Sequence, residues 1–268
     1  MISVIVPTHN HRGLLEKKLR ALETQQGEFE VVVVADGCSD DTVDFLQTYQ
    51  PPYPLELIQT PGLGAAGARN RGAEIARGDI LLFSDDDVIP QPGWIEAFQQ
   101  AFARERVVYL GGFRFKEGHV WKPALRFGRL GFNNVNGVAL GMTLDIFRKV
   151  GGFAEWIKGY GGEDLELGYR LIKAGIPIRY LPQAQAEHLG PTPTCNLTKA
   201  RQAGVQAVHI VRYHKDPRLA LELGVHPALV ALKLALLPSF KGLWGPRGDY
   251  ELAYAWGASE AWNPPSAS

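Results

Sequence analysis

The 268-residue chain is long enough for one large α/β domain or for one domain with an extension, and its 46% hydrophobic residues are ample for a buried core. Lys and Arg together number 28, as do Asp and Glu, so no global charge favours binding to nucleic acid or to an anionic membrane. Two cysteines, Cys38 and Cys195, are too few for a disulfide scaffold or a zinc cluster. The N-terminus lacks the pattern of a signal peptide, so we expect a reducing, cytoplasmic location.

Strand and helix patterns alternate along the first ninety residues. Short apolar runs without polar alternation are typical of strands that are covered on both faces, and the segments between them have helical spacing. The expected strands are 2–7, 29–36, 55–60 and 79–83, and the expected helices are 11–25, 39–49 and 64–78, the second of them capped by Ser39 or Asp40. These repeated units predict an α/β fold with a mostly parallel sheet flanked by helices.

Polar residues gather where the expected strands end. Thr8, His9 and Asn10 follow the first strand, Asp36 ends the second, and the run Asp85 to Asp87 follows the fourth. In parallel sheets, ligands bind beyond the carboxyl ends of the strands. We therefore expect these residues to line one pocket.

The three neighbouring aspartates have no basic residue beside them between Gly78 and Pro90. In extended geometry Asp85 and Asp87 project to one side and Asp86 to the other. Paired carboxylate oxygens suit a hard divalent cation that also holds phosphate oxygens. The alternative is a solvated acidic turn ahead of the helix expected over 92–102.

A glycine-rich segment points to a different class of enzyme. The segment "GLGAAG", Gly62 to Gly67, is formally the fingerprint of a dinucleotide-binding unit, and Asp85 follows at about the expected distance. Two strand–helix units precede it, however, whereas the fingerprint usually occupies the first. An NAD(P)-dependent oxidoreductase is therefore the alternative function.

The second half contains another acidic pair. "GYGGEDLELGYRLIKAG" predicts a helix from Glu163 to Ala174, with Leu165, Gly168 or Tyr169, and Ile172 on its buried face. Glu163 and Asp164 then lie at its N-terminus, where capping alone would explain them. His188 follows a short strand expected over 178–181 and could supply a nitrogen ligand to a metal, although a lone histidine is more often structural.

Five motifs in order, "VIVPTHN", "VVVVADGCSDDT", "GAAGARNRGAEIARGDILLFSDDD", "GYGGEDLELGYRL" and "EHLG", resemble family 2 glycosyltransferases of the GT-A fold over residues 1 to 190. The "GGED" segment is similar to that of galactosyltransferases and chondroitin polymerases. The resemblance implies an inverting transfer of a sugar from a nucleotide-sugar to the hydroxyl of a carbohydrate or glycolipid acceptor, assisted by Mn²⁺ or Mg²⁺, in cell-envelope polysaccharide synthesis.

The resemblance also implies roles for single residues. The nucleotide-sugar would be held by Pro7, Thr8, His9, Asn10, Asp36, Arg69, Asp85 and Asp86, with Ala68 and Asn70 beside Arg69. Asp87 and His188 would be metal ligands, with Asp85 as a further candidate. Asp164 would be the general base, and Glu163 and Tyr160 would contact the sugar or acceptor.

One departure from the family's pattern leaves the identity of the nucleotide open. The family usually has Asp-Asp-Gly-Ser after the second strand, where this chain has Ala35-Asp36-Gly37-Cys38, so UDP is expected but not fixed. A catalytically inactive sugar-nucleotide binding module is a third alternative, against which Asp87 and Asp164 argue. The aromatic residues Phe113, Phe115, Trp121, Phe127 and Phe132 could form an acceptor wall or belong to the core.

We expect a catalytic domain over 1–195, with a nucleotide-sugar half to about residue 90 and an acceptor half over 91–195. Residues 196–268 would form a helical extension ending in a disordered tail from about residue 257. The apolar stretch 223–240 could pack on the catalytic domain, pair in a homodimer, or lie on a membrane surface with Lys241 and Arg247 at the headgroups. Packing is the first choice.

Overall fold

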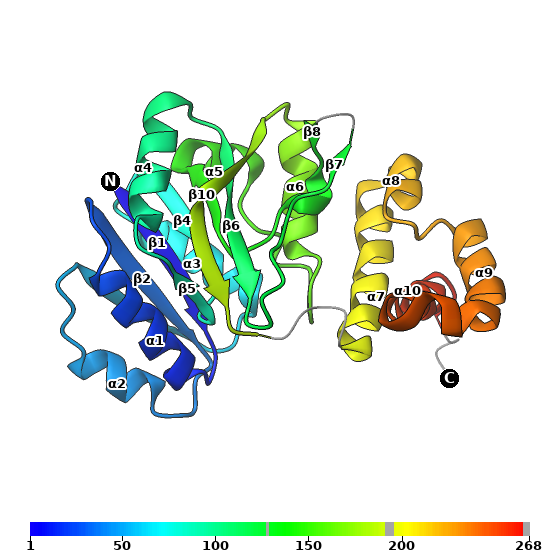
Figure 1. The fold of residues 1–268 in the computed structure, drawn as a ribbon, viewed down its shortest axis with the longest axis horizontal. Coiled ribbons are helices and arrows are strands. Elements are labelled where there is room, and N and C mark those ends of the chain that lie inside the picture. The colour runs from blue at the N-terminus through cyan, green and yellow to red at the C-terminus, as the bar shows by residue number, and fades with distance from the viewer. Residues whose placement is uncertain (127–128, 191–195, 265–268) are drawn as a thin grey trace. The chain divides into compact units, whose positions relative to one another are not determined.

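The computed structural model describes residues 1–126, 129–190 and 196–264 (Figure 1). The chain forms two compact units. The first comprises Met1–Trp156 and Glu163–Pro191, and the second comprises Ile157–Gly162 and Thr192–Ser268.

Within the described residues, an eight-stranded sheet with the order β3-β2-β1-β4-β9-β6-β10-β5 forms the centre of the first unit. Its strands are β1 (Ile2–Thr8), β2 (Phe29–Asp36), β3 (Leu55–Thr60), β4 (Ile80–Phe83), β5 (Val88–Pro90), β6 (Val108–Phe115), β9 (Leu140–Thr143) and β10 (Ile178–His188). β1 runs parallel to β2 and β4, as β2 does to β3 and β6 to β10. β9 is antiparallel to both β4 and β6 and so joins the two parallel groups. The predicted α/β fold with a mostly parallel sheet is confirmed.

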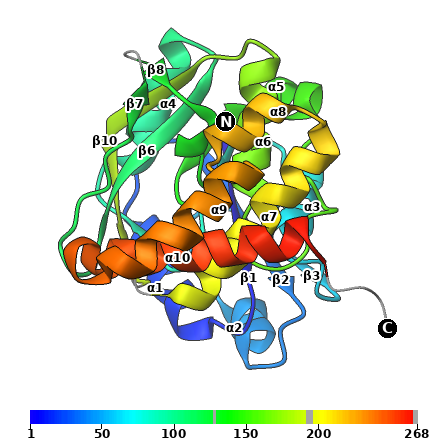
Figure 2. The ribbon, with the colours of Figure 1, turned by 90° about the vertical axis from the view of Figure 1, so that its right-hand side faces the viewer.

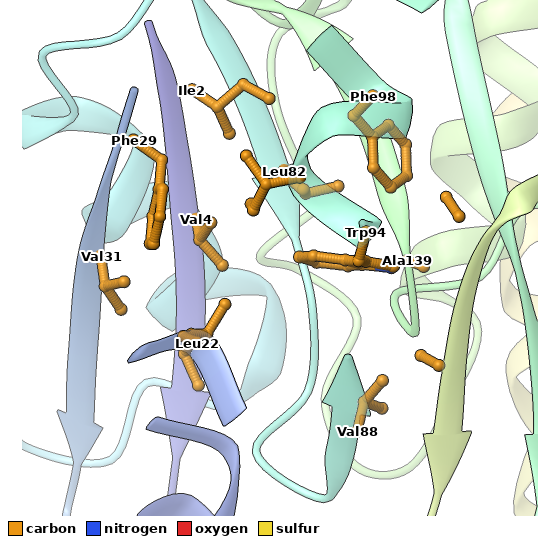
Figure 3. Packing of buried hydrophobic residues seen from close by; sticks show 14 of the residues in the cluster. Ile2, Val4, Leu22, Phe29, Val31, Leu82, Val88, Trp94, Phe98 and Ala139 are labelled. Carbon is orange, nitrogen blue, oxygen red and sulfur yellow. The ribbon is translucent and has the colours of Figure 1, made fainter. Parts of the chain in front are cut away.

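Helices cover both faces of this sheet. Alternate residues of β1 point to opposite faces, because successive side chains of a strand do: Val4 packs with the leucines of α1, and Ile5 packs with the alanines of α3. Figure 3 shows the first cluster, in which Trp94 and Phe98 of α4 lie near Leu82 and Ala139. The helices of the unit are α1 (Arg12–Glu23), α2 (Thr42–Thr48), α3 (Ala65–Ile75), α4 (Trp94–Arg104), α5 (Leu144–Val150) and α6 (Glu163–Lys173), with a short 3-10 turn η1 (Phe132–Asn134) and the hairpin strands β7 (Leu125–Arg126) and β8 (Arg129–Leu130).

Two local predictions are wrong. α2 begins later than expected, after Asp41, whose side chain makes no capping hydrogen bond. The buried face of α6 is formed by Glu166 to Tyr169 and Leu171, whereas Ile172 is 42% exposed. The reason is that Glu166 is buried by its ion pair with Arg170, which also binds the carbonyl of Gly152, so a polar pair occupies part of the face that hydrophobicity alone would assign to Ile172.

The second unit is helical (Figure 2). It contains α7 (Leu197–His214), α8 (Pro217–Glu222), α9 (Pro227–Leu236), the 3-10 turn η3 (Leu237–Phe240) and α10 (Lys241–Trp262), which is kinked at Gly245 ahead of Pro246. α7 and α10 pack closely because two glycines face the partner backbone: a Cβ on Gly204 would lie 2.0 Å from the carbonyl oxygen of Tyr254. α10 continues to Trp262, so the first part of the predicted disordered tail is helical instead, and residues 265–268 lie outside the described residues.

Candidate active site

Arg69 of α3 lies at the centre of the acidic groups. Its side chain is 4% exposed, and its Nη2 donates to Asp85 Oδ1 at 2.6 Å. Its Nη1 donates to Glu163 Oε1 at 3.1 Å and lies 3.7 Å from Asp164 Oδ1. The guanidinium also lies 5.3 Å from the ring centroid of Phe153. One buried cation therefore joins the first aspartate of the Asp85–Asp87 run to the acidic pair at the start of α6.

Asp164 is held by one oxygen. Its Oδ2 accepts the backbone N–H of Gly137 at 2.8 Å, while Oδ1 is buried and makes no hydrogen bond among the described residues. Burial raises the pKa of Asp164 to about 7, Arg69 opposes this, and the neighbouring carboxylates of Glu163 and Asp85 add to it. The side chain as a whole keeps 23% of its accessible surface. Asp164 is thus a partly accessible carboxylate whose raised pKa lies near neutrality.

Asp86 turns away from this group. It is 7% exposed, accepts the hydroxyl of Thr8 at 2.7 Å, and lies 3.2 Å from Nδ1 of His11. Burial raises the pKa of Asp86, and the bonds to Thr8 and His11 limit the rise. The contacts of Asp86 therefore tie the loop after β1 to the loop after β4. His11 was missed in the sequence, because a histidine in a helix-capping position carries no pattern of its own.

Asp87 and His188 come together although they are 101 positions apart. Nε2 of His188 lies 3.9 Å from Oδ2 of Asp87, and Leu189 donates its N–H to the Asp87 carbonyl at 2.9 Å. β10 runs further than expected, from Ile178 to His188, so the histidine ends the strand rather than following a short one. Its antiparallel pairing with β5 sets His188 opposite Val88, next to Asp87.

A carboxylate oxygen and an imidazole nitrogen facing each other are donors that Mn²⁺ accepts. Within the described part of the chain no three or more His, Cys, Asp and Glu side chains are arranged so that they could hold a metal ion by themselves. A metal held by Asp87 and His188 would therefore take its remaining ligands from the donor and from water. Nδ1 of His188 accepts the N–H of Gly190 at 3.1 Å, which places the proton of the neutral ring on Nε2. Ligation through Nε2 therefore requires the other tautomer and the loss of the Gly190 hydrogen bond.

Lys18 lies beneath the aspartate loop and was not identified from the sequence. It is fully buried on α1, and its Nζ donates to Ser84 Oγ at 2.8 Å and to the carbonyl of Val88 at 2.9 Å. These two acceptors flank the Asp85–Asp87 run. Burial lowers the pKa of Lys18 to about 8, although the three aspartates act in the opposite direction. Lys18 therefore supplies part of the positive charge that offsets the three aspartates.

Asp36 is fully engaged by the glycine-rich loop. Its Oδ1 accepts from the hydroxyl of Thr60 at 2.6 Å and from the N–H groups of Gly62 and Leu63 at 3.0 and 2.7 Å, and its Oδ2 accepts from Gly64 at 2.8 Å. Burial alone would raise the pKa of Asp36, but these four donors outweigh it and the pKa is lowered. The amides that would hold a pyrophosphate in a dinucleotide fingerprint thus already hold a carboxylate of the chain itself.

The loop after β1 is shaped by its own polar contacts. Nδ1 of His9 donates to the carbonyl of Asp36 at 2.6 Å. Asn10 has a φ of 55°, and its Oδ1 accepts the N–H groups of Ser39 and Asp40 at 2.7 and 3.2 Å. Pro7 is half-buried, whereas His9 and Asn10 are exposed. This loop and the loop after β2 are therefore bound to one another at the carboxyl edge of the sheet.

Other predicted site residues have different surroundings. Asn70 pairs with the backbone of Phe153, accepting at 2.8 Å and donating at 2.9 Å, and so anchors the loop ahead of α6. Tyr160 belongs to the second unit, where the ammonium of Lys199 lies 4.3 Å from its ring centroid. Among the aromatic residues, Phe113, Phe115 and Phe132 are buried in the core, and Phe127 lies outside the described residues.

Comparison with known families finds two matches. The model described as glycosyl transferase family 2 matches residues 3–150, and the model described as the N-terminal domain of galactosyltransferase matches residues 126–190. Validoxylamine A glucosyltransferase of Streptomyces hygroscopicus subsp. jinggangensis is 32% identical over 222 residues, which cover 66% of this chain and 53% of that protein. Chondroitin synthase of Pasteurella multocida is 25% identical over 251 residues, covering 76% of this chain and 26% of the synthase. The chain thus spans about half the length, or less, of these curated relatives.

Solved structures share the fold. A mannosyltransferase of Pyrobaculum calidifontis in complex with GDP-Man and Mn²⁺ superposes with a TM-score of 0.71 over 98% of this chain and 87% of that chain, at 19% identity. Residues 1–349 of S. aureus TarS in complex with UDP-GlcNAc give a TM-score of 0.62 over 97% and 90% of the two chains, at 18% identity. The fold is the GT-A fold that the motifs led us to expect, and the chain belongs to glycosyl transferase family 2.

Proposed function

We propose that this chain transfers a sugar from a nucleotide-sugar, with a UDP-sugar as the first candidate, to a hydroxyl group of a carbohydrate or glycolipid acceptor, with inversion at the anomeric carbon. Membership of glycosyl transferase family 2 supports sugar transfer. The segment Gly62 to Gly67 lies within the family match, and its amides bind Asp36, so neither feature favours the NAD(P)-dependent alternative.

One observation carries the mechanism: the unsatisfied Oδ1 of Asp164. A buried carboxylate oxygen without a hydrogen-bond partner is costly, and a catalytic role is one of the reasons for which such an atom is kept. Its pKa of about 7 is matched to a base that works near neutral pH. The N–H of Gly137 binds the other oxygen and so helps to fix the orientation of the carboxylate. Its hydrogen bond goes to Gly137 rather than to the first turn of α6, which argues against a role as a helix cap.

The transfer then needs one displacement. The carboxylate of Asp164 takes the proton of the acceptor hydroxyl, and the oxygen of that hydroxyl forms a bond to the anomeric carbon. The bond from that carbon to the diphosphate oxygen breaks on the opposite face, and its electron pair leaves with the nucleoside diphosphate. No second carboxylate has to act as a nucleophile. Arg69 keeps Glu163 and Asp85 in place on either side and stabilises Asp164 before it accepts the proton.

Asp87 and His188 would hold Mn²⁺ or Mg²⁺, which when bound offsets the negative charge that develops on the diphosphate. Asp85 is the weaker candidate ligand, because its Oδ1 is bound to Arg69. We assign the nucleotide to the loop of Pro7, Thr8, His9 and Asn10 with Asp36, and we infer that Asp36 acts by shaping that loop, since its oxygens are already engaged. Glu163 and Tyr160 remain our candidates for the sugar or acceptor.

The test is a donor screen that measures release of nucleoside diphosphate. UDP-, GDP- and dTDP-hexoses are incubated with the chain in Mn²⁺, in Mg²⁺ and in EDTA. We expect release with one nucleotide class and its loss in EDTA. Donor binding without release under any condition would favour the inactive binding module, and equal release in EDTA would exclude the metal role of Asp87 and His188.

A further inference from the structure

Helix α9 in the second unit has its apolar side outward. Seven of its ten residues are exposed, and all seven are Pro, Ala or Leu. Among them Leu229, Leu232 and Leu236 are 36%, 54% and 49% exposed and follow one another at helical spacing along one side. A surface helix of a globular protein normally carries polar residues there.

The polar residue of α9 points the other way. Lys233 is the one charged residue in the helix sequence, and its Nζ forms an ion pair with Glu251 of α10 at 2.8 Å and lies 5.7 Å from the ring centroid of Tyr254. Val230 is buried on the same inward side. The charged side chain of α9 therefore faces α10, and the exposed residues on the outer face of the helix are all apolar.

We propose that the outer face of α9 docks on an anionic lipid bilayer, with its leucines at the boundary between headgroups and acyl chains. The stretch Pro217–Ser239 meets the length and composition of a membrane span, with a mean hydropathy of 1.6 and 22% of its window buried. In the structure it forms two helices, α8 and α9, separated at Gly224, which has a φ of +66°. α9 alone is about 15 Å long, half the hydrocarbon thickness, so it lies in the plane of the surface rather than crossing it.

Charge identifies the bilayer as the occupant. Residues 196–264 contain eight Lys and Arg against five Asp and Glu, although the whole chain has 28 of each. Exposed cations occur at both ends of the Pro217–Ser239 stretch: Lys215 precedes it, Arg218 is its second residue, and Arg247 follows it. A symmetric contact between two copies would bring like charges together, whereas an anionic bilayer attracts each such cation. The excess of basic residues in this part of the chain is not evident from the zero net charge of the whole sequence.

The full chain is tested by sedimentation with vesicles of phosphatidylcholine, with and without about one third phosphatidylglycerol, at about physiological salt, where screening is moderate. We expect binding to the anionic vesicles. The variant with Leu229→Gln, Leu232→Gln and Leu236→Gln should bind at least about tenfold more weakly, because three apolar contacts are lost. Leu125→Gln is the matched control, since Leu125 is 64% exposed in the first unit and its change should leave binding unaltered.

A second pair of changes tests the charges. Arg218→Gln with Arg247→Gln should weaken binding to anionic vesicles by the order of tenfold and leave any binding to neutral vesicles unchanged. A wild-type chain that fails to sediment with anionic vesicles overturns the proposal. A triple-glutamine variant that binds vesicles normally also overturns it. The proposal is likewise overturned if the three changes lower the melting temperature sharply, because the leucines are then packed within the protein, or if they turn a dimer into a monomer in the absence of lipid.

Discussion

Arg69 and Asp164 approach each other without a hydrogen bond: Nη1 of the arginine lies 3.7 Å from Oδ1 of the aspartate, while the same nitrogen donates to Glu163 at 3.1 Å. The cation is thus near enough to stabilise a negative charge on Asp164 without donating a hydrogen bond to Oδ1. This arrangement suits the proposed role of Asp164 as the general base.

Asp164→Asn should reduce sugar transfer by about 10²–10⁴-fold, because an amide cannot take the acceptor proton. The amide oxygen can still accept the N–H of Gly137, so the melting temperature and the affinity for UDP should stay near the wild-type values. Turnover is measured by release of nucleoside diphosphate, and binding by calorimetry. Asp40→Asn is the control, since Asp40 is an exposed acid that binds the N–H of Thr42, and its rate should hardly change. Wild-type turnover by Asp164→Asn would move the search for the base to Glu163.

The pH dependence of the rate should show the same group. Because the pKa of Asp164 is raised to about 7, the base is protonated below that value and the rate should rise as pH increases through it. Stability should change in the opposite direction: between the ordinary pKa of 3.8 and about 7 the folded protein binds more protons than the unfolded chain, so this residue makes stability fall as pH rises. Denaturant unfolding of Asp164→Asn over this range should lack that contribution, and a variant with the wild-type slope would contradict the raised pKa.

His188→Ala should lower Mn²⁺ affinity at least about tenfold, because one of two facing protein donors is lost. Calorimetry of Mn²⁺ with UDP provides the measurement. His119→Ala is a matched control: the rings of His119 and His188 lie 6.2 and 5.2 Å from that of Phe115, but only His188 lies beside Asp87 among the contacts described. Equal metal affinity in the two variants, with a lower melting temperature for His188→Ala, would make His188 a packing residue.

Thr8→Val should destabilise the fold by about 1–3 kcal/mol, because the buried Asp86 loses the hydroxyl donor at 2.7 Å. UDP affinity should change little, since the hydroxyl is directed at Asp86. Urea unfolding and UDP calorimetry separate the two effects, and Thr48→Val, on the exposed side of α2, should change neither. A large loss of UDP affinity at unchanged stability would show that Thr8 and Asp86 contact the donor directly.

Lys18→Met should also destabilise the protein by about 1–3 kcal/mol near neutral pH, since the Val88 carbonyl loses its donor. The pKa of Lys18 is lowered from 10.5 to about 8, so between these values the unfolded chain binds the extra proton and the wild-type protein gains stability as pH rises. Urea unfolding at several pH values should show this rise in the wild type and its absence in Lys18→Met. Lys17→Met, one position earlier and exposed, should behave as the wild type.

The sequence predicted the strands well because their apolar runs end at polar residues. β2 and β3 occupy the expected residues, and the aspartates follow β4 as expected. β9 was not expected: Leu140–Thr143 is four residues long, and its antiparallel position between β4 and β6 depends on pairing partners that periodicity does not name.

Within the site, Arg69 meets the predicted acids Asp85, Glu163 and Asp164, but such pairings could not be read from local pattern. Arg69 and Glu163 are 94 positions apart, and the fold brings them within 3.1 Å. Lys18 lies in an amphipathic helix whose sequence gives no reason to bury a lysine, and its burial follows from the acceptors Ser84 and Val88. Such polar pairings depend on three-dimensional contact, whereas hydrophobic spacing is a local property.

The position of Arg69 has a consequence for engineering. The arginine lies in the first third of the 268-residue sequence, and two of its three acidic partners lie beyond the middle of it. Beside it, a Cβ on Gly137 would lie 2.4 Å from the guanidinium, so even an alanine there would displace it. Chimeras that join the front half of one family member to the back half of another should therefore retain activity only when the arginine, the glycine and the acidic pair are inherited as a matched set. Directed recombination libraries should be designed around that three-part linkage rather than around the boundary between the halves.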